Sequence, residues 1–182
     1  MRKVLFLDRD GVINIDHGYL YKPEQFEFID GVFEGCRQFQ QAGFDIAIIT
    51  NQSGIGRGYY TESDFAKLTQ WMVAEFNNQH INILDVKYCP HHPEKANPKY
   101  LKVCECRKPA PGMLLEVINQ HQVDPKMSIM VGDKPSDMQA AINAGIATKY
   151  LVTTGKTLTE QGENLADAVF DSLEVLAQSV LN

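Results

Sequence analysis

The sequence contains no apolar run close to the roughly 20 residues that a transmembrane helix needs, so we expect no membrane span. Positive charge is also scarce, with 17 lysine and arginine residues against 23 aspartate and glutamate residues and a formal net charge of −6. This balance argues against non-specific binding to nucleic acid or to an anionic membrane, because both require a cationic surface. A local basic site for a small phosphate remains compatible with it.

Internal repeats, low-complexity tracts and long linkers are lacking as well. With 44% hydrophobic and 22% charged residues over 182 positions, the composition is that of a globular protein and excludes collagen, coiled-coil and disordered chains. A chain of this length buries about 70% of its surface on folding. We therefore expect one domain that covers residues 1–182.

The apolar segment near the N-terminus, residues 4–7, is only four residues long and ends at Asp8. The apolar core of a signal peptide has about 7–15 residues. We therefore expect a cytoplasmic protein, and disulfide bonds are rare in that compartment.

Strand-like and helix-like segments alternate along the chain. The strongest strand candidates are continuous apolar runs at residues 4–7, 46–49 and 128–131, with weaker ones at 84–88, 148–152 and 168–170. Helical periodicity is present at residues 32–39, 65–76, 113–123, 138–144 and 173–181. Continuous apolar runs are typical of strands buried on both faces of a parallel sheet. The pattern predicts a doubly wound, Rossmann-like α/β fold with a mostly parallel sheet and helices on both faces.

Polar residues follow each of the three strongest strand candidates. They are Asp8-Arg9-Asp10-Gly11, Thr50-Asn51-Gln52-Ser53-Gly54 and Gly132-Asp133-Lys134. In open α/β sheets the ligand binds beyond the carboxyl ends of the strands, so these groups are expected to meet. Each motif alone is common in solvated turns, but carboxylates brought together by packing require a cation or a proton to compensate them. The combination predicts a cation-dependent site.

The four cysteines divide into two groups. Cys36 lies on the apolar face of a predicted helix and is expected in the core. The others combine with a histidine in the set Cys89, His91, Cys104 and Cys106, three sulfurs and one nitrogen that suit a closed structural Zn²⁺ site. His92 could replace His91, and a disulfide is the alternative to a metal. The intervening segment is rich in proline and has no helix or strand pattern, so it needs some such anchor.

The ordered motifs resemble those of the haloacid dehalogenase superfamily of phosphatases. The matching residues are Asp8-x-Asp10-Gly11-Val12, Thr50, Lys108 and Gly132-Asp133-x3-Asp137. More narrowly, Asp16-His17-Gly18-Tyr19, the segment 50–58 and Cys104-Glu105-Cys106-Arg107-Lys108-Pro109 are similar to the bacterial heptose bisphosphate phosphatases, whose sister group is the histidinol-phosphatases. Superfamily members often carry a cap domain, but the intervals between these motifs leave no room for one. The relatives carry a zinc loop where residues 89–106 lie.

This resemblance implies a role for each motif residue. Asp8 would attack phosphorus, and Asp10 would act as general acid and base. Thr50 and Lys108 would bind the transferring oxygens. Asp8, Asp133 and the main-chain carbonyl of Asp10 would hold Mg²⁺, with Asp137 behind them.

The resemblance implies that the substrate is a small sugar bisphosphate, D-glycero-D-manno-heptose 1,7-bisphosphate, cleaved at the 7-phosphate in lipopolysaccharide precursor synthesis. We expect the enzyme to be a monomer. Substrate contacts are expected from Asp16, His17, Gly18, Tyr19, Asn51, Gln52, Ser53, Arg57, Arg107 and Lys134. Arg57 and Arg107 are the candidates for the phosphate that does not react. The segment from Gly54 to Gly58 could be a flexible connection or a substrate-facing loop.

Three other functions stay open from the sequence. A histidinol-phosphate phosphatase would share the motifs. A receiver-like signalling domain also combines acidic residues, threonine and lysine on a doubly wound sheet, although receivers place the accepting aspartate on a later strand. A zinc-stapled phosphosugar-binding module would have no need for Asp10.

Overall fold

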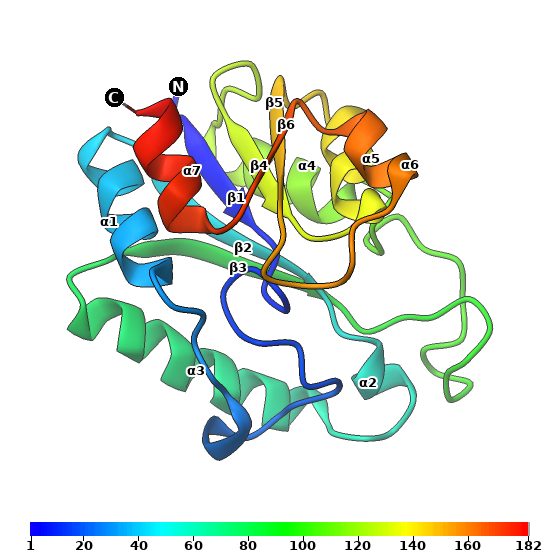
Figure 1. The fold of residues 1–182 in the computed structure, drawn as a ribbon. Coiled ribbons are helices and arrows are strands. Elements are labelled where there is room, and N and C mark those ends of the chain that lie inside the picture. The colour runs from blue at the N-terminus through cyan, green and yellow to red at the C-terminus, as the bar shows by residue number, and fades with distance from the viewer. Residues whose placement is uncertain (182) are drawn as a thin grey trace.

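A computed structural model describes residues 1–181, which form one six-stranded sheet with helices on both faces (Figure 1). The strands are β1 (Val4–Leu7), β2 (Asp45–Asn51), β3 (Ile83–Cys89), β4 (Ile129–Gly132), β5 (Thr148–Val152) and β6 (Ala168–Phe170). Their order is β3-β2-β1-β4-β5-β6, and every neighbouring pair is parallel. The predicted fold class is confirmed.

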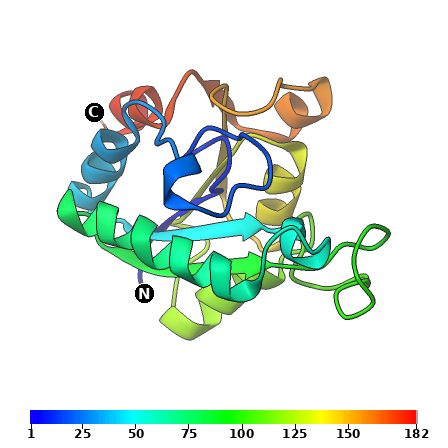
Figure 2. The same cartoon turned by 90° about the horizontal axis from the view of Figure 1, so that it is seen from below.

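The helices lie in two layers that enclose the sheet (Figures 1 and 2). They are α1 (Val32–Gln41), α2 (Ser53–Gly56), α3 (Glu62–Asn78), α4 (Gly112–His121), α5 (Pro135–Asn143), α6 (Glu160–Leu165) and α7 (Leu173–Val180), with a 3₁₀ turn, η1, at Pro23–Gln25. The apolar faces of α1, α3 and α7 pack on one side of the sheet, and those of α4 and α5 on the other.

Strand β1 explains why the central strands are apolar at every position. Successive side chains of a strand point to opposite faces. Leu5 and Leu7 accordingly pack in the core formed with α1, α3 and α7, while Val4 and Phe6 pack in the core formed with α4 and α5. All four side chains are fully buried, so no position of this strand tolerates a polar residue.

Capping residues set most of the helix boundaries. Thr61 begins α3, where its hydroxyl accepts the N–H of Asp64 and the Asp64 carboxylate accepts the N–H of Thr61, as the sequence predicts. The α4 helix ends two residues earlier than predicted because Gln122 takes a left-handed conformation (φ 56°). The α5 helix begins three residues earlier than predicted, at Pro135, because Asp137 caps its first turn.

Residues Gly54–Gly58 are not a flexible connection, since Gly54–Gly56 belong to the short helix α2 (Ser53–Gly56). Two of its glycines are needed for close packing. A Cβ on Gly54 would overlap the Tyr60 ring, and one on Gly56 would lie 2.5 Å from the Pro90 carbonyl oxygen. Helix α2 therefore packs closely against Tyr60 on one side and against the segment after β3 on the other.

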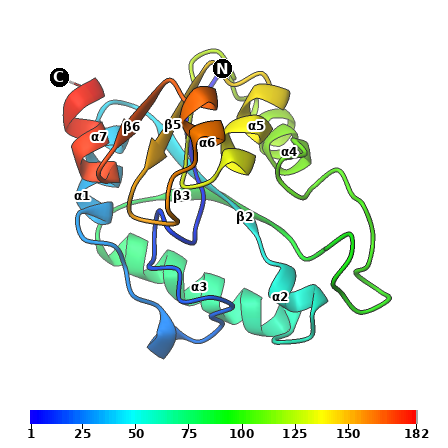
Figure 3. The ribbon, with the colours of Figure 1, turned by 45° about the vertical axis from the view of Figure 1, so that its right-hand side comes forward.

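Both chain ends lie at the same end of the sheet in two views (Figures 1 and 3). The carboxyl ends of the parallel strands lie at the opposite end, where the loop after β3 and helix α2 are side by side. Within residues 1–181, no helix is long and apolar enough to cross a membrane.

Candidate active site

Asp8 is the first residue after β1 and is buried, with 4% of its surface exposed. Its Oδ1 accepts hydrogen bonds from the Arg9 N–H at 2.8 Å and from the Lys108 ammonium at 2.9 Å. Its Oδ2 faces the Lys134 ammonium at 4.0 Å. Burial raises the pKa of Asp8 to about 7, and the Lys108 ammonium works against that rise. One oxygen is thus committed to donors and the other remains available to a ligand.

Lys108 reaches the site from a loop 100 residues away in the sequence. Its ammonium also contacts Asp137 Oδ1 at 2.6 Å and donates to the Ile49 carbonyl at 2.8 Å. Burial alone would lower the pKa of Lys108, but the carboxylates of Asp137 and Asp8 raise it. The Asn51 side chain fixes the lysine backbone with two hydrogen bonds: its Oδ1 accepts the Lys108 N–H at 3.0 Å, and its Nδ2 donates to the Lys108 carbonyl at 3.1 Å.

Asp133 and Asp137 complete the acidic part of the site. Asp137 Oδ2 accepts the N–H groups of Asp133 (3.2 Å) and Lys134 (3.1 Å), so Asp137 holds the turn after β4. Asp133 Oδ2 accepts the Lys156 N–H at 2.8 Å. Asp133 Oδ1 is buried without a hydrogen-bond donor and lies 3.4 Å from the Lys134 ammonium. Burial raises the pKa of Asp133, with Lys134 opposing the rise.

These carboxylates fit a hard divalent cation. One oxygen from each of Asp8, Asp133 and Asp137 lies within 4.8 Å of the others. Asp137 Oδ1 is ion-paired with the Lys108 ammonium and its Oδ2 accepts two main-chain N–H groups, whereas Asp8 Oδ2 and Asp133 Oδ1 face the ammonium of Lys134. Oxygen ligands of this kind suit Mg²⁺.

Asp10 is turned away from that acidic group. Its carboxylate accepts hydrogen bonds from Arg9 Nη2 (2.9 Å), Asn14 Nδ2 (3.0 Å) and Gln52 Nε2 (3.0 Å). Burial would raise the pKa of Asp10, but the Arg9 guanidinium and the hydrogen bonds outweigh it and hold the pKa below its ordinary value. The carboxylate of Asp10 is therefore not a metal ligand in this arrangement, which leaves only its main-chain carbonyl for that role.

Two adjoining cavities share Asp10, Asn51, Ser53 and Lys134 in their walls, and their volumes are about 260 and 520 Å³. The smaller one is also lined by Arg9, Asp16, Gly18, Tyr19, Gln52, Gly54, Tyr60 and Lys156. The larger one is also lined by Asp8, His92, Pro93, Glu94, Arg107, Lys108, Pro109, Ser136 and Asp137. Most of the predicted substrate contacts therefore lie on these walls.

Two of the predicted substrate contacts, His17 and Arg57, line neither of these cavities. His17 pairs with Glu27 at 3.3 Å and lines a different hollow with Leu20 and Phe26. The Arg57 guanidinium lies over the ring of Tyr19, 5.5 Å from its centroid, and is absent from both cavity walls. Arg57 directly follows helix α2, and its side chain is half-buried.

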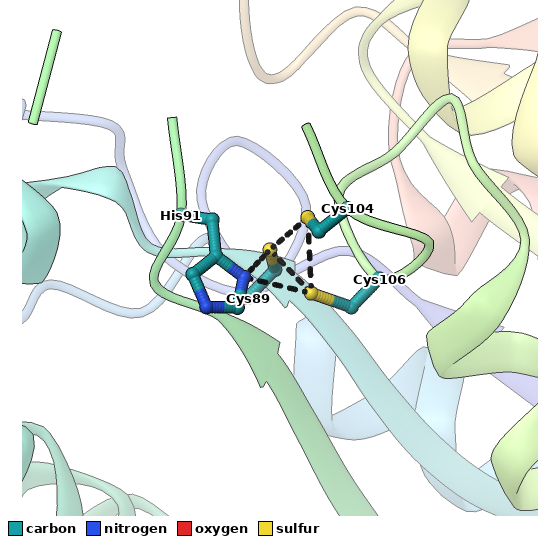
Figure 4. Close-up of side chains that lie close together, drawn as sticks. All are labelled: Cys89, His91, Cys104 and Cys106. Atoms are coloured by element: carbon teal, nitrogen blue, oxygen red, sulfur yellow. Dashed lines mark hydrogen bonds between the residues drawn. The ribbon is translucent and has the colours of Figure 1, made fainter. Parts of the chain in front are cut away.

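The predicted cysteine and histidine set comes together as a compact cluster (Figure 4). Cys106 Sγ lies 2.7 Å from Cys89 Sγ and 3.3 Å from Cys104 Sγ, and His91 Nδ1 lies 3.3 Å from Cys106 Sγ. All four cysteines of the chain are free thiols. Four such donors converging on one point, as Figure 4 shows, have the composition of a closed Zn²⁺ site.

His92 does not join this cluster. Its Nδ1 accepts the N–H groups of Glu94 (3.1 Å) and Lys95 (3.0 Å), and its ring lines the larger cavity. The alternative between the two histidines is thus settled in favour of His91 as the cluster member.

The cysteine cluster adjoins the acidic site through the backbone. Cys89 is the partner of Asn51 in the register of β2 and β3, and Asn51 holds Lys108. The Arg107 guanidinium donates to the His91 carbonyl at 3.3 Å. The order of this loop is therefore linked to the placement of Arg107 and Lys108.

Sequence reasoning missed several residues of the site. Lys156 follows β5, so the same strand-end argument could have found it. Arg9 stands between two recognised aspartates, yet its bidentate contact with Asp10 has no pattern in the sequence. Tyr60 reaches Gln52 only because helix α2 turns the chain back.

Comparison with known proteins identifies the family. A HAD-hydrolase-like family model matches residues 105–176. The chain is 48% identical over 176 residues to the D-glycero-beta-D-manno-heptose-1,7-bisphosphate 7-phosphatase of Escherichia coli K12, covering 97% of this chain and 92% of the relative. It is 49% identical to the protein of that name from Vibrio cholerae, covering 94% and 92%. The chain belongs to this family of phosphatases.

Solved structures agree with this family. The D,D-heptose 1,7-bisphosphate phosphatase of B. bronchiseptica, complexed with magnesium and phosphate, matches with a TM-score of 0.82 and 29% identity over 98% of both chains. A HAD-like phosphatase from Mesorhizobium loti matches with a TM-score of 0.83 and 32% identity, covering all of this chain and 88% of that one. The predicted superfamily and its hydrolase activity are confirmed, and the receiver-like and binding-module alternatives are set aside.

Proposed function

We propose that this phosphatase removes the 7-phosphate of D-glycero-D-manno-heptose 1,7-bisphosphate, with Mg²⁺, and leaves heptose 1-phosphate for ADP-heptose and lipopolysaccharide core synthesis. Relatives of that name at 46–49% identity support the substrate. The observation that supports the chemistry most directly is the buried Asp8, with one oxygen held by Lys108 and the other facing the cation position.

In the first step, the Asp8 carboxylate attacks phosphorus and the bond from phosphorus to the sugar oxygen breaks, while Asp10 gives its proton to that oxygen. An aspartyl-phosphate forms on Asp8 and the sugar alcohol leaves. The N–H of Arg9 and the ammonium of Lys108 both donate to Asp8 Oδ1. Those two donors orient the carboxylate so that it presents Oδ2 to the cavity.

Asp10 is suited to the proton transfers on either side of that intermediate. Its contacts with Arg9 and Asn14 stabilise the carboxylate, which is the form needed to take a proton from the hydrolytic water. A bound phosphate brings negative charge next to Asp10 and raises its pKa, which favours the protonated form that the leaving sugar oxygen requires. Water then replaces Asp8 on phosphorus, and inorganic phosphate is released.

The developing charge on the phosphoryl oxygens is met by groups already in place. Thr50 is fully buried beside Asp10, and its hydroxyl can donate to one of these oxygens. Lys108 offers its ammonium next to Asp8. Mg²⁺, held by Asp8, Asp133 and the Asp10 carbonyl, would supply further positive charge there.

The second phosphate of the substrate needs cations outside this centre. Arg107 lines the larger cavity beside Lys108 and is our candidate for it. Arg57 was an equal candidate from the sequence, but its guanidinium stacks on Tyr19 and it lines neither cavity. Asp16, Gly18 and Tyr19 remain proposed contacts for the sugar because they line the smaller cavity.

We also propose that Cys89, His91, Cys104 and Cys106 bind one structural Zn²⁺ in the loop of residues 89–106. Four protein ligands leave no open position for water, so such a metal would not activate a nucleophile. Its effect on catalysis would act through the contact from Arg107 to the His91 carbonyl. We further propose that the chain works as a single capless domain, as a monomer and in the cytoplasm.

The experiment that tests the substrate assignment is phosphate release over a small panel of sugar phosphates and histidinol phosphate. We expect the highest kcat/KM for heptose 1,7-bisphosphate. A value for histidinol phosphate equal to or above it would overturn the assignment.

A further inference from the structure

The side chain of Gln52 connects two proposed active-site residues. Its Nε2 donates to Thr50 Oγ1 at 2.8 Å and to Asp10 Oδ2 at 3.0 Å, so both amide hydrogens are used. Its Oε1 accepts the hydroxyl of Tyr60 at 2.5 Å. Thr50, Gln52 and Tyr60 are buried, with exposed fractions of 0%, 3% and 6%. The amide is therefore fully bonded away from solvent.

We propose that Tyr60 is a positioning residue, which acts through Gln52 to orient Thr50 and Asp10 for phosphoryl transfer. The inference rests on the proposed function, because it assigns Thr50 and Asp10 the roles given above. The Tyr60 hydroxyl donates to Gln52 and reaches Thr50 and Asp10 only through that amide. It fixes which end of the Gln52 amide faces the reacting groups.

The direction of the hydrogen bonds around the Gln52 amide leaves the hydroxyl hydrogen of Thr50 available to the substrate. A hydroxyl can accept and donate at the same time, and Thr50 Oγ1 already accepts from Gln52. Its own hydrogen is consequently free for an oxygen of the transferring phosphoryl group. The reversed amide would place Gln52 Oε1 against the Asp10 carboxylate, an unfavourable contact between two acceptors.

Tyr60 is needed because Gln52 Oε1 would otherwise be a buried acceptor without a donor. Such a group regains a partner by turning toward water, since leaving it unpaired is costly. That rotation would withdraw Nε2 from Thr50 and Asp10. Burial raises the pKa of Tyr60 to about 12, so its hydroxyl keeps its proton and remains a donor at neutral pH.

The local packing is adapted to bring the Tyr60 hydroxyl to Gln52. A Cβ on Gly54 would lie 2.8 Å from both Tyr60 Cζ and its hydroxyl oxygen, so only glycine leaves room for the ring at that point. On another side the ring stacks with Tyr21, with centroids 5.5 Å apart and planes at 12°. The ring would therefore keep its position without its hydroxyl.

The test is Tyr60→Phe, which removes the hydroxyl and leaves the packed ring. One neutral hydrogen bond is lost, so we expect kcat to fall about 3- to 10-fold with KM changed less than about twofold. The matched control is Tyr21→Phe, the same chemical change on the stacked neighbour, and it should retain the wild-type kcat. Thermal unfolding of each variant checks that the folded fraction is unchanged.

A double-mutant cycle separates positioning through Gln52 from a general structural effect. On a Gln52→Leu background, which has no amide to orient, Tyr60→Phe should cost less than about a further twofold. Wild-type kcat in Tyr60→Phe, or the same loss on both backgrounds, would overturn the inference. The comparison uses whichever phosphomonoester the wild-type enzyme hydrolyses fastest, so an error in the substrate assignment would show separately, as a wild-type enzyme inactive on heptose bisphosphate.

Discussion

Gly155→Ala should weaken Mg²⁺ binding without unfolding the protein. Gly155 follows β5 and packs on the carboxyl group of Asp133, a proposed Mg²⁺ ligand. A Cβ at this position would lie 2.5 Å from both Cβ and Cγ of Asp133. Because these atoms are anchored at the end of β4, the clash cannot be relieved by the end of a flexible side chain alone. The loop that carries Gly155 must move instead.

The magnitude follows from the bonds that this loop makes. Its displacement breaks the hydrogen bond from the Lys156 N–H to Asp133 Oδ2 at 2.8 Å and the one from Thr154 Oγ1 to the Gly11 carbonyl at 2.8 Å. A hydrogen bond to a charged group contributes about 1.5–3 kcal/mol. If most of that orienting free energy is lost, the Mg²⁺ concentration for half-maximal activity rises about 10- to 100-fold.

The assay is phosphate release titrated with Mg²⁺, together with calorimetric Mg²⁺ binding, which does not depend on turnover. The control is Gly162→Ala, in helix α6, where the new Cβ would meet the side-chain end of Leu151 at 3.3 Å. That variant should keep the wild-type Mg²⁺ dependence. Wild-type Mg²⁺ affinity in Gly155→Ala, with normal folding, would refute the reasoning that Asp133 must be held by this loop in order to bind the metal.

Three further predictions follow from the geometry of the active site, the cysteine cluster and the core. Asp10→Asn should lower kcat by roughly 10²–10⁴-fold with little change in thermal stability, as measured by steady-state kinetics and unfolding. Cys106→Ser should lower zinc content and activity together, while the Mg²⁺ requirement persists. Metal analysis of the wild-type protein should give about one zinc per chain. Full activity of the variant without zinc would exclude the link through Arg107. Cys36 is fully buried and its pKa is raised to about 12 by burial, so alkylation of the native protein at pH 8, followed by mass spectrometry, should leave it unmodified even after zinc chelation exposes the other thiols.

The sequence predicts the sheet well because its central strands are buried on both faces. A strand such as β1 cannot contain a polar residue, so its limits are visible as a continuous apolar run. Helix α3 is equally visible, since Thr61 and Asp64 cap it and Phe65 begins its apolar stripe. Helix α2 was not predicted, because its four residues include two glycines and no periodic pattern.

The active site likewise contains residues that the sequence predicts and residues that it does not. Asp8, Thr50 and Asp133 could be predicted because each lies at the carboxyl end of a strand, and the geometry of parallel sheets brings these ends together. Side-chain direction could not be predicted from spacing. Arg57 lies in a matching motif, yet it turns to Tyr19, and Tyr60 lies outside every strand end, yet its hydroxyl reaches Gln52. Such contacts depend on the local path of the chain.

The most direct test of the account is phosphorus NMR of the reaction with heptose 1,7-bisphosphate, run with wild-type protein and with Asp8→Asn. We expect wild-type protein to convert the C7 phosphate signal to inorganic phosphate while the C1 phosphate signal persists. Asp8→Asn, which is nearly isosteric and should remain folded, is expected to leave both signals unchanged. Loss of the C1 phosphate first, or substantial turnover by folded Asp8→Asn, would contradict the account.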